Sequence, residues 1–438
     1  MLFSGDMQRT IGLALLAGAP LAGLAAAACG SSSSSAAPSG ADAATSLDGT
    51  METANDAAAD AALLDGSPEA AGDASSTCPN LPAATLVPPT SPLVVEGDPG
   101  SALGIYDPSL VYPTGAAGGL MSYSTVAPNS VHTRIAVSTD RGATFQYAAD
   151  ANDIVSPIAV TTTDPGFCED GPCQVQGVLW HEVSSIVADP SDTAAPYKLF
   201  VHSYVSANGG ATLRRDWGYI GMQSATSPTS WGTETKLLGW SSNATISTAG
   251  VTQVLSNIPE LADCVAFTEP AALVGPLGID LALSCAYSPS PGVVNIRVEL
   301  LRSTDHAASF LYVSKLVAAE DFACIHGAAP QILGADLFTV GSSEYVIVSP
   351  TGPVSNTDAG GYRGCVTIPL ADAGAGLIAR ASNGAPAVVS FVEAADGRFT
   401  GPCTYAEGAT AIGQLVPMQF SPTDLPLFRI MRTTIPEP

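Results

Sequence analysis

The chain has 438 residues, of which 15 are Lys or Arg and 40 are Asp or Glu, giving a formal net charge of -25. Such a charge repels polyphosphate and anionic lipid headgroups, so nucleic acid and anionic membrane surfaces are disfavoured as partners. The mean hydropathy is +0.27. No uncharged apolar run of about 18 residues follows residue 29, so no membrane-spanning helix is predicted.

The first 29 residues are predicted to be an export signal. A short charged start precedes an Ala-rich apolar stretch from residue 11 to residue 28, and a polar tract follows. Residues 24–30, Leu-Ala-Ala-Ala-Ala-Cys-Gly, resemble a bacterial lipobox in which Cys29 would carry the lipid. Ala26 stands where such motifs usually have Leu, and ordinary cleavage near Ala28 is the alternative. The expected location is therefore the bacterial cell envelope, with a lipid anchor in the outer membrane, or the medium after secretion.

Residues 30–77 are predicted to be a disordered linker. They contain eight acidic residues, no basic residue and no aromatic residue, and Ser, Ala and Gly dominate the remainder. Such a segment cannot bury enough apolar area to offset the entropy lost on ordering. The folded domain is therefore expected to be 78–438, with the linker holding it away from the membrane.

The cysteine count favours disulfides. Without Cys29, eight cysteines remain in a chain that is predicted to be exported. Neither a CxxC spacing nor a His-rich segment accompanies them, so no zinc site is predicted. The sequence alone does not choose among the many possible pairings. The preferred pairs are Cys168–Cys173, Cys264–Cys285, Cys324–Cys365 and Cys78–Cys403.

The fold class follows from short apolar runs between Gly, Pro and Asp clusters, with little helical periodicity. This pattern predicts an all-β sandwich, barrel or propeller. An acid or its substitute opens an apolar segment at intervals of 60 to 87 residues, which favours a repeat architecture. We predict a five-bladed β-propeller with blades starting near residues 104, 179, 266, 326 and 404, and six blades are less favoured. A strand around residues 84–95 is expected to complete the last blade. The repeat marks are Asp107, Glu182, Glu269, Ala329, where the acid is missing, and Glu407.

A second repeated feature keeps phase with these marks. Residues 138–145 read Ser-x-Asp-x-Gly-x-Thr-Phe, which resembles the Asp box, or BNR repeat, of sialidase-like propellers. Residues 303–310 are a degenerate copy with Ala307 in place of Gly, and residues 224–231 keep only the Ser-to-aromatic spacing. The Asp is expected to accept backbone N–H bonds in a tight turn for which Gly supplies the torsion. The role of these turns is structural, because they lie away from the channel of a propeller.

The first strand of each propeller blade lines the channel, so Asp107, Glu182, Glu269 and Glu407 are predicted to converge. Crowded carboxylates push one another's pKa values apart, so that one stays protonated while another stays ionised. An expected separation of roughly 6 to 9 Å is closer to that of inverting than of retaining glycoside hydrolases. As an alternative, a carboxylate at a strand start often caps a turn, and propellers with non-catalytic channels keep such residues.

The layout resembles five-bladed glycoside hydrolases of the arabinanase, xylosidase and invertase type. Residues 106–109, Tyr-Asp-Pro-Ser, match the first-blade signature, and residues 267–270, Phe-Thr-Glu-Pro, match a general-acid strand. The resemblance implies that Asp107 is the base or nucleophile, Glu269 the general acid and Glu182 a supporting carboxylate. Those families generally have Asp as the supporting carboxylate, so Glu182 departs from their pattern.

Residues next to these acids offer stacking faces and hydrogen bonds for a sugar ring. No cofactor and no metal ligand is assigned, although hard oxygen ligands are plentiful enough for Ca²⁺. The residues assigned to substrate binding are Tyr106, Trp180, His181, His326, Tyr405 and Glu407.

Three functions stay open at this point. The first is an envelope-anchored glycoside hydrolase that acts on neutral glycans, because an acidic channel disfavours an anionic sugar. The second is a propeller that binds a glycan or a protein without turnover, which the missing acid at Ala329 favours. The third is an exo-sialidase, which needs three arginines around a substrate carboxylate and a Tyr-Glu nucleophile pair, and residues 214–217, Arg-Arg-Asp-Trp, are the one cluster that could move into the pocket. A monomer that meets the membrane through the lipid anchor alone is expected.

Overall fold

The computed structural model describes residues 81–87, 92–113, 118–153, 156–208, 212–290, 293–322, 331–351, 362, 364–394, 401–406, 411–416 and 428–434. All of them belong to one compact unit. The signal-peptide and linker predictions concern residues beyond these ranges. The other predicted positions outside the described residues are Cys29, Cys78, Cys324, His326, Ala329 and Glu407.

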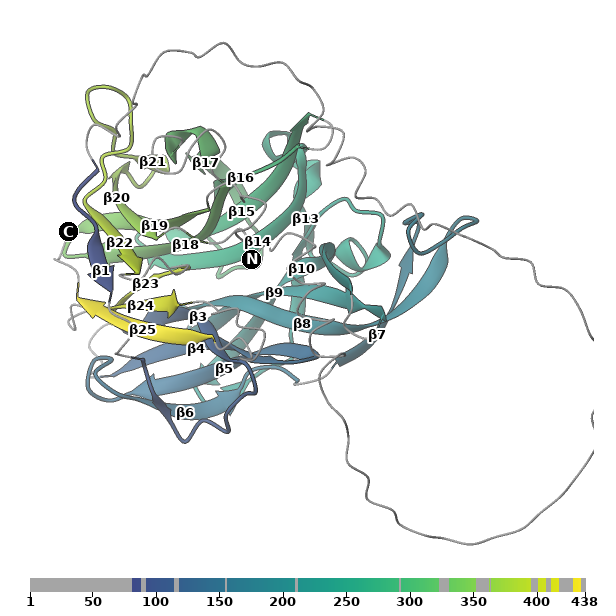
Figure 1. Cartoon of the computed structure of the whole chain (residues 1–438), viewed down its shortest axis with the longest axis horizontal. Helices are drawn as coiled ribbons and strands as arrows, with labels where there is room; N and C mark the ends of the chain where they lie inside the picture. Colours follow the sequence, from purple (N-terminus) through teal and green to yellow (C-terminus); the bar gives the residue numbers. More distant parts are fainter. Residues whose placement is uncertain are drawn as a thin grey trace, which may run out of the picture. The chain divides into compact units, whose positions relative to one another are not determined.

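The described chain consists of β-strands that form five sheets (Figure 1). This confirms the all-β prediction for the described ranges. Helical structure within them is limited to short 3₁₀ turns, and no helix there is long and apolar enough to span a membrane. The turns are η3 (Thr245–Ser247), η4 (Leu255–Asn257), η5 (Pro259–Leu261) and η6 (Ala319–Phe322).

In the first two sheets, strands that follow one another in sequence pair mainly antiparallel. Their middle strands β4 and β9 are buried along nearly their whole length, as expected for strands packed on both faces. The first sheet contains β3 (Gly104–Val111), β4 (Gly119–Ala127), β5 (Ser130–Ser138), β6 (Phe145–Asp150) and β2 (Val95–Glu96). The second contains β7 (Ser156–Thr162), β8 (Cys173–Ala188), β9 (Tyr197–Ala207), β10 (Thr212–Ser227), β11 (Ser230–Trp231), β12 (Thr235–Gly239) and β13 (Gln253–Val254).

The remaining three sheets repeat the antiparallel order. The third contains β14 (Cys264–Gly275), β15 (Gly278–Ser290), β16 (Val293–Ser303) and β17 (Leu311–Val317). The fourth contains β18 (Gln331–Val340), β19 (Ser343–Thr351), β20 (Cys365–Asp372), β21 (Leu377–Ile378), β22 (Ser390–Ala394) and β1 (Thr85–Val87). The fifth contains β23 (Thr404–Ala406), β24 (Ala411–Val416) and β25 (Arg429–Thr434).

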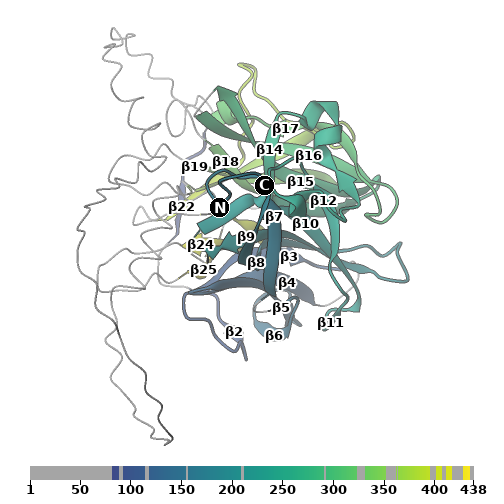
Figure 2. The same cartoon turned by 90° about the vertical axis from the view of Figure 1, so that its right-hand side faces the viewer.

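The N-terminal strands join sheets that are distant in sequence. β1 pairs in parallel with β22, Leu93 N donates to Ile430 O on β25 at 2.7 Å, and β2 pairs in parallel with β6. The prediction that this segment completes the last sheet is therefore correct only near Leu93. β1 extends the fourth sheet instead, because it pairs with the edge strand β22. Both views place β24 and β25 between β22 and β4 (Figure 1, Figure 2), so the segment crosses the fifth sheet.

One strand from each of the five sheets takes part in a ring of contacts, and we call these five the ring strands. β3 contacts β8, β8 contacts β14, β14 contacts β18, β18 contacts β23, and β23 contacts β3. These strands start at residues 104, 173, 264, 331 and 404, close to the five predicted repeat starts. Side chains that are far apart in sequence are therefore brought near one another along this ring.

Four ring strands carry a β-bulge at a corresponding place. The register with the neighbouring strand shifts in β3, β8, β14 and β18, and a residue with a positive φ lies at each shift. Asp107 and Glu269 therefore occupy equivalent positions, as predicted. Glu182 precedes its bulge by one residue, so its predicted equivalence with Asp107 is wrong, and it corresponds to Tyr106. The bulge residues are Asp107 (φ 49°), Val183 (φ 52°), Glu269 (φ 54°) and Gly334 (φ 69°).

Serine side chains link consecutive ring strands just after the bulges. Ser109 Oγ accepts a hydrogen bond from Ile186 N at 3.2 Å, and Ser185 Oγ accepts one from Ala272 N at 2.8 Å. Both serines lie two residues after a bulge, and the third strand has Ala271 at that position. The two bonds satisfy buried backbone N–H groups and fix the register of the first sheet on the second and of the second on the third.

The two Asp-containing turns have the predicted local geometry. Asp140 Oδ1 accepts a hydrogen bond from Thr144 N at 2.8 Å, while Gly142 lies at a φ of 80°. Asp305 occupies the same place in the second copy, where Ala307 takes a φ of 69°. Because glycine adopts this torsion at little cost and alanine does not, Ala307 holds local strain that the surrounding packing must offset.

Three disulfides lie within the described residues. Cys168–Cys173 closes the loop between β7 and β8, and Cys264–Cys285 joins β14 to β15, as predicted. Cys365–Cys403 joins β20 to the residue before β23, so the predicted pairs Cys324–Cys365 and Cys78–Cys403 are wrong. The physical reason is proximity, because the fourth and fifth sheets adjoin there and hold the two Cα atoms 6.1 Å apart, within disulfide reach.

An aspartate replaces the linking serine between the fourth and fifth sheets. Asp336 lies two residues after Gly334, and its Oδ2 accepts hydrogen bonds from Thr404 Oγ1 at 2.7 Å and from Tyr405 N at 3.2 Å. Its side chain is buried, and this burial raises the pKa of Asp336 to about 7. The link between these two sheets is therefore titratable near neutral pH.

We expect ionisation of Asp336 to lower the free energy of unfolding. The unfolded chain ionises this group near its ordinary pKa of 3.8. Its stabilising effect is therefore full below about pH 4 and is lost as the pH rises through about 7. Asp336→Asn keeps an acceptor oxygen but does not titrate, so the stability of the wild type relative to this variant should fall by about 2–4 kcal/mol between pH 4 and pH 8. Urea unfolding of both proteins at these pH values tests this, and parallel pH profiles would contradict it.

Candidate functional site

Three predicted carboxylates come together where β3, β8 and β14 adjoin. Asp107 and Glu269 lie at the bulges of β3 and β14, and Glu182 lies beside the bulge of β8. Their exposed fractions are 1%, 0% and 3%, respectively. They are close enough to interact electrostatically. Burial is the largest cause of the raised pKa of Asp107, and the charges of Glu269 and Glu182 raise it further. We call these three residues the carboxylate cluster.

Glu182 is held as an anion by three donors. Tyr106 Oη donates to its Oε1, Tyr204 Oη donates to its Oε2, and Arg215 Nη2 lies 3.4 Å from the same Oε2. Burial raises the pKa of Glu182, but the Arg215 charge and the two hydroxyl bonds outweigh burial, so the pKa is lowered. Burial and the Glu182 charge raise the pKa of both tyrosines, which therefore remain protonated donors.

Asp107 has hydrogen-bonding capacity that the described residues do not use. Neither of its oxygens has a hydrogen-bond partner among them. Buried carboxylates in folded proteins nearly always accept hydrogen bonds. Burial, then Glu269 and Glu182, raise the pKa of Asp107, and Arg215 opposes this shift. Asp107 therefore favours its protonated form and keeps two oxygens available to another molecule.

Glu269 is contacted by a tyrosine from the C-terminal half of the chain. Tyr362 Oη donates to Glu269 Oε1 at 3.4 Å. Burial, followed by the Glu269 charge, raises the pKa of Tyr362, so its hydroxyl stays protonated and remains a donor. The Tyr362 hydroxyl therefore helps to position Glu269.

Aromatic rings surround the carboxylate cluster. Tyr106 stacks on Phe428 with ring centroids 4.8 Å apart. Tyr204 packs against Trp180 at 6.0 Å and against His202 at 4.8 Å. The indole N–H of Trp180 has no hydrogen-bond partner among the described residues. An aromatic face with an unused donor suits a sugar ring and one of its hydroxyls.

Two residues assigned to substrate binding are engaged elsewhere. His181 points to the opposite face of β8 from its sequence neighbours, and its Nε2 pairs with Glu234 Oε2 at 3.0 Å. Tyr405 stacks on Phe338 with ring centroids 4.3 Å apart, in the core between the fourth and fifth sheets. Of the described residues with that assignment, Tyr106 and Trp180 are the ones that the structure brings to the carboxylate cluster.

Two tyrosines of the cluster carry no repeat mark in the sequence. Tyr204 is the direct cross-strand partner of Trp180 in the β8–β9 pair, so strand alternation places it on the same face. That argument requires the β8–β9 register, which the sequence does not provide. Tyr362 belongs to no predicted strand, and no signal in the sequence could have identified it.

Among the described arginines, Arg215 joins the carboxylate cluster and most others pair with acids elsewhere. A trio of arginines around the cluster, which an exo-sialidase needs, is therefore absent from the ranges that the structure describes. The other pairs are Arg134 with Asp98 and Asp150, Arg214 with Asp164 and Asp216, Arg297 with Asp263 and Glu299, Arg302 with Asp280, and Arg380 with Asp321.

Closely spaced candidate metal ligands occur at one other place among the described residues. Among the described residues, one group of three candidate ligands has its donor atoms within 4.8 Å of one another, namely Cys264, Cys285 and Glu299. The two sulfur atoms of that group form a disulfide, so they are not available as thiolates.

Neither a protein-family model nor a curated protein matches this sequence. Among solved structures, that of BT0996 in an RGII complex is similar, with a TM-score of 0.46, 8% identity, and 80% of this protein and 93% of that one covered. The native arabinanase of Bacillus subtilis has a TM-score of 0.40 at 10% identity, over 75% and 94% of the two proteins. The α-L-arabinofuranosidase of Podospora anserina in complex with cellotriose has a TM-score of 0.40 at 10% identity, over 81% and 99%.

We expect Asp107→Asn to stabilise the protein at pH 8. It removes a buried carboxylate whose two oxygens lack partners among the described residues, which should raise the free energy of unfolding by about 1–3 kcal/mol. The gain should shrink at pH 4, because the raised pKa keeps Asp107 protonated there. Urea unfolding of the purified variant at both pH values measures this.

Glu182→Gln is the matched control for that measurement. It leaves the charge of Arg215 without its carboxylate partner and should lower the free energy of unfolding by about 3 kcal/mol. If Asp107→Asn destabilised the protein to a similar degree at pH 8, Asp107 would be a structural residue with partners that the described contacts do not include.

Proposed function

We propose that this protein is an envelope-anchored glycoside hydrolase of the five-bladed β-propeller type that acts on neutral glycans. Cys29 would carry the anchor, and the carboxylate cluster would carry the chemistry. Asp107 and Glu269 are the pair that exchanges protons with the substrate and water, and Glu182 supports them as a fixed anion. Tyr106 and Trp180 supply contacts to the sugar.

The five sheets and the contacts among their ring strands support the five-bladed fold. Those strands contact one another in a ring, and each sheet then runs outward through antiparallel neighbours. In such a fold the ligand binds where the ring strands converge. The carboxylate cluster occupies that place in the first three sheets.

The observation that carries the proposal is the unused capacity of Asp107. Two other buried aspartates of the described chain have partners: Asp280 pairs with Arg302, and Asp336 accepts two hydrogen bonds. Asp107 is equally buried, carries a strained φ of 49° and lacks partners for both oxygens among the described residues. Uncompensated polar atoms and backbone strain gather at functional sites, where they serve the ligand rather than stability.

Hydrolysis needs one carboxyl that gives a proton to the leaving oxygen and one that removes a proton from the attacking water. The raised pKa of Asp107 suits proton donation, whereas the family resemblance gives Asp107 the base role and Glu269 the acid role. The two assignments differ in one measurable respect. Loss of the acid is tolerated when the leaving group is activated, and loss of the base is not.

A binding protein without turnover is the second candidate, and burial favours it. The three carboxylates are at most 3% exposed, so a sugar reaches them only if the groups that cover them move aside. The bulge residues of the second and fourth sheets, Val183 and Gly334, also bring no carboxylate to the ring. A propeller that holds a glycan or protein at its rim would need no access to the cluster.

An aryl-glycoside panel tests the proposed hydrolysis. The wild type should release phenol from at least one neutral furanoside or pyranoside, and Asp107→Asn and Glu269→Gln should each reduce kcat/KM by about 100-fold or more on substrates with poor leaving groups. With dinitrophenyl leaving groups, the variant that lacks the acid should recover most of its rate and the other should not. The recovery identifies the acid.

Glu299→Gln provides a control from outside the cluster, because Glu299 is also buried but pairs with Arg297 on β16. It should leave kcat/KM within about threefold of the wild type. The hydrolase proposal would be contradicted if the wild type were inactive on all substrates. If glycan binding were also unaffected by Asp107→Asn, the binding function would be supported instead.

A further inference from the structure

We infer that the disulfide hairpin of the second sheet positions Glu182, acting through the consecutive residues Arg214 and Arg215. We call residues 156–179 the disulfide hairpin, which comprises β7, the loop closed by Cys168–Cys173 and the first part of β8. Its catalytic meaning rests on the function proposed above. The positioning itself concerns only contacts within the described chain.

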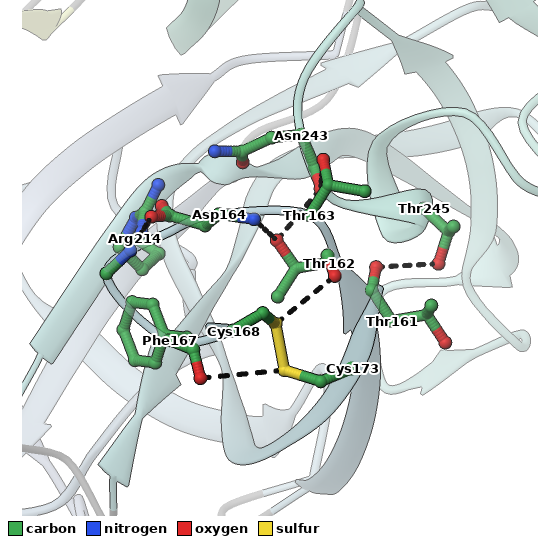
Figure 3. Close-up of a disulfide and its surroundings, with 11 residues drawn as sticks. Thr161, Thr162, Thr163, Asp164, Phe167, Cys168, Cys173, Arg214, Asn243 and Thr245 are labelled. Atoms are coloured by element: carbon green, nitrogen blue, oxygen red, sulfur yellow. Dashed lines mark hydrogen bonds and ion pairs between the residues drawn. A yellow bond between two sulfur atoms is a disulfide. The ribbon is translucent and has the colours of Figure 1, made fainter. Parts of the chain in front are cut away.

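Arg214 is fixed to the disulfide hairpin and to its own strand. Its guanidinium donates to Asp164 in the hairpin loop, and to both carboxylate oxygens of Asp216 at 2.9 and 2.7 Å. The same group lies over the rings of Trp217, at 4.1 Å from the centroid, and Phe167, at 5.5 Å. Figure 3 shows Arg214 beside Asp164 and Phe167, close to the disulfide. Five separate contacts therefore hold one side chain in place.

The loop that receives Arg214 is itself constrained. Asp164 Oδ1 accepts from Gly166 N at 2.8 Å, and the Asp164 carbonyl accepts from Cys168 N at 2.9 Å. Cys168 is then tied to Cys173 at the start of β8 (Figure 3). The closed loop therefore fixes the position of the Asp164 carboxylate, and the hydrogen bond from Arg214 to this carboxylate fixes the position of the Arg214 guanidinium.

Arg215 continues the chain toward the carboxylate cluster. The register of β10 with β9 shifts between Arg214 and Gly218, so the backbone at Arg215 departs from regular pairing. The contacts show that the two neighbouring arginines meet different partners. Arg214 contacts Asp164 in the disulfide hairpin, while Arg215 Nη2 lies 3.4 Å from Glu182 Oε2 and the Arg215 guanidinium lies over the Tyr204 ring at 5.2 Å.

The contact between Arg215 and Glu182 has little tolerance for displacement. At 3.4 Å it is already longer than a typical charge-assisted hydrogen bond of about 2.8 Å. Charges in a buried site interact strongly, and a small retreat of the guanidinium weakens both its hold on Glu182 and its influence on Asp107. The disulfide hairpin thereby influences the charge state of the cluster without touching the substrate, which makes Arg214 a positioning residue.

The test is a titration of the carboxyl groups in the full-length, ligand-free protein. ¹³C NMR of selectively labelled Asp and Glu side chains should show that Arg214→Gln raises the pKa of Glu182 by about 0.5 or more. Arg215→Lys should raise it in the same direction, since an ammonium lacks the planar fork that reaches Oε2. Cys168→Ser combined with Cys173→Ser should act like Arg214→Gln, because it opens the loop that holds Asp164.

Arg302→Gln is the matched control, because Arg302 makes a comparably buried ion pair with Asp280 in the third sheet. It should lower the thermal unfolding temperature but leave the titration of Glu182 unchanged. If Arg214→Gln also lowered stability without moving that titration, the hairpin would be only a stabilising element and the inference would be wrong.

The titration remains informative if the protein proves not to hydrolyse glycosides, since it uses no substrate. If hydrolysis is found, the same variants should move the acid limb of the kcat/KM pH profile to higher pH, and Arg302→Gln should not. If the variants shifted the titration of Glu182 but left the pH profile of kcat/KM unchanged, the hairpin would still position Glu182. Glu182 would then have no role in the reaction.

Discussion

The β-bulge in the ring strands, with its residue at a positive φ, is the constraint on which the carboxylate cluster depends. In a regular strand, Tyr106 and Asp107 would point to opposite faces, and only one of them could reach Glu182. The bulge at Asp107 brings both to the same side, one as a donor to Glu182 and one as a neighbouring charge. Aspartate tolerates a positive φ better than most residues, but the β-branched Val183 does not. Its torsion shows that tertiary packing, with Ser124 Oγ accepting from Val183 N, determines the bulge.

Among the residues that the structure describes, the charge distribution of the carboxylate cluster depends on the Arg215 guanidinium, which lowers the pKa of both Glu182 and Asp107 against the effect of burial. Arg215 and two tyrosine hydroxyls satisfy Glu182, so that residue keeps its charge despite burial. Glu269 receives a hydroxyl, and Asp107 receives no hydrogen bond from the described residues. The cluster therefore contains both a fixed anion, Glu182, and a carboxyl that favours its proton, Asp107, which is the condition for separate acid and base roles at one pH.

The sequence predicts the parts of this arrangement that are local or repeated. Regularly spaced acids mark the first three ring strands, although the structure places these acids within the strands rather than at their starts. Closely spaced cysteines indicate the pairs Cys168–Cys173 and Cys264–Cys285. It does not show where one residue is inserted into a strand, so Glu182 is placed one position away from its true equivalent. It also does not show which sheets adjoin when the ring closes, and the Cys365–Cys403 pair depends on that adjacency. Tyr362 reaches Glu269 for the same non-local reason.

The sheets that carry the carboxylate cluster and the sheets that follow them are linked in different ways. The cluster draws its carboxylates from the first three sheets, whose ring strands are linked by neutral serines. The fourth and fifth sheets are joined by a disulfide and by Asp336, and the N-terminal segment spans from β22 past β25 to β6. Closing a long loop costs entropy before the contacts that it brings together can form. Between the fourth and fifth sheets the described links are thus a covalent bond and a buried carboxyl, whereas the seams that carry the carboxylate cluster are joined by neutral hydrogen bonds.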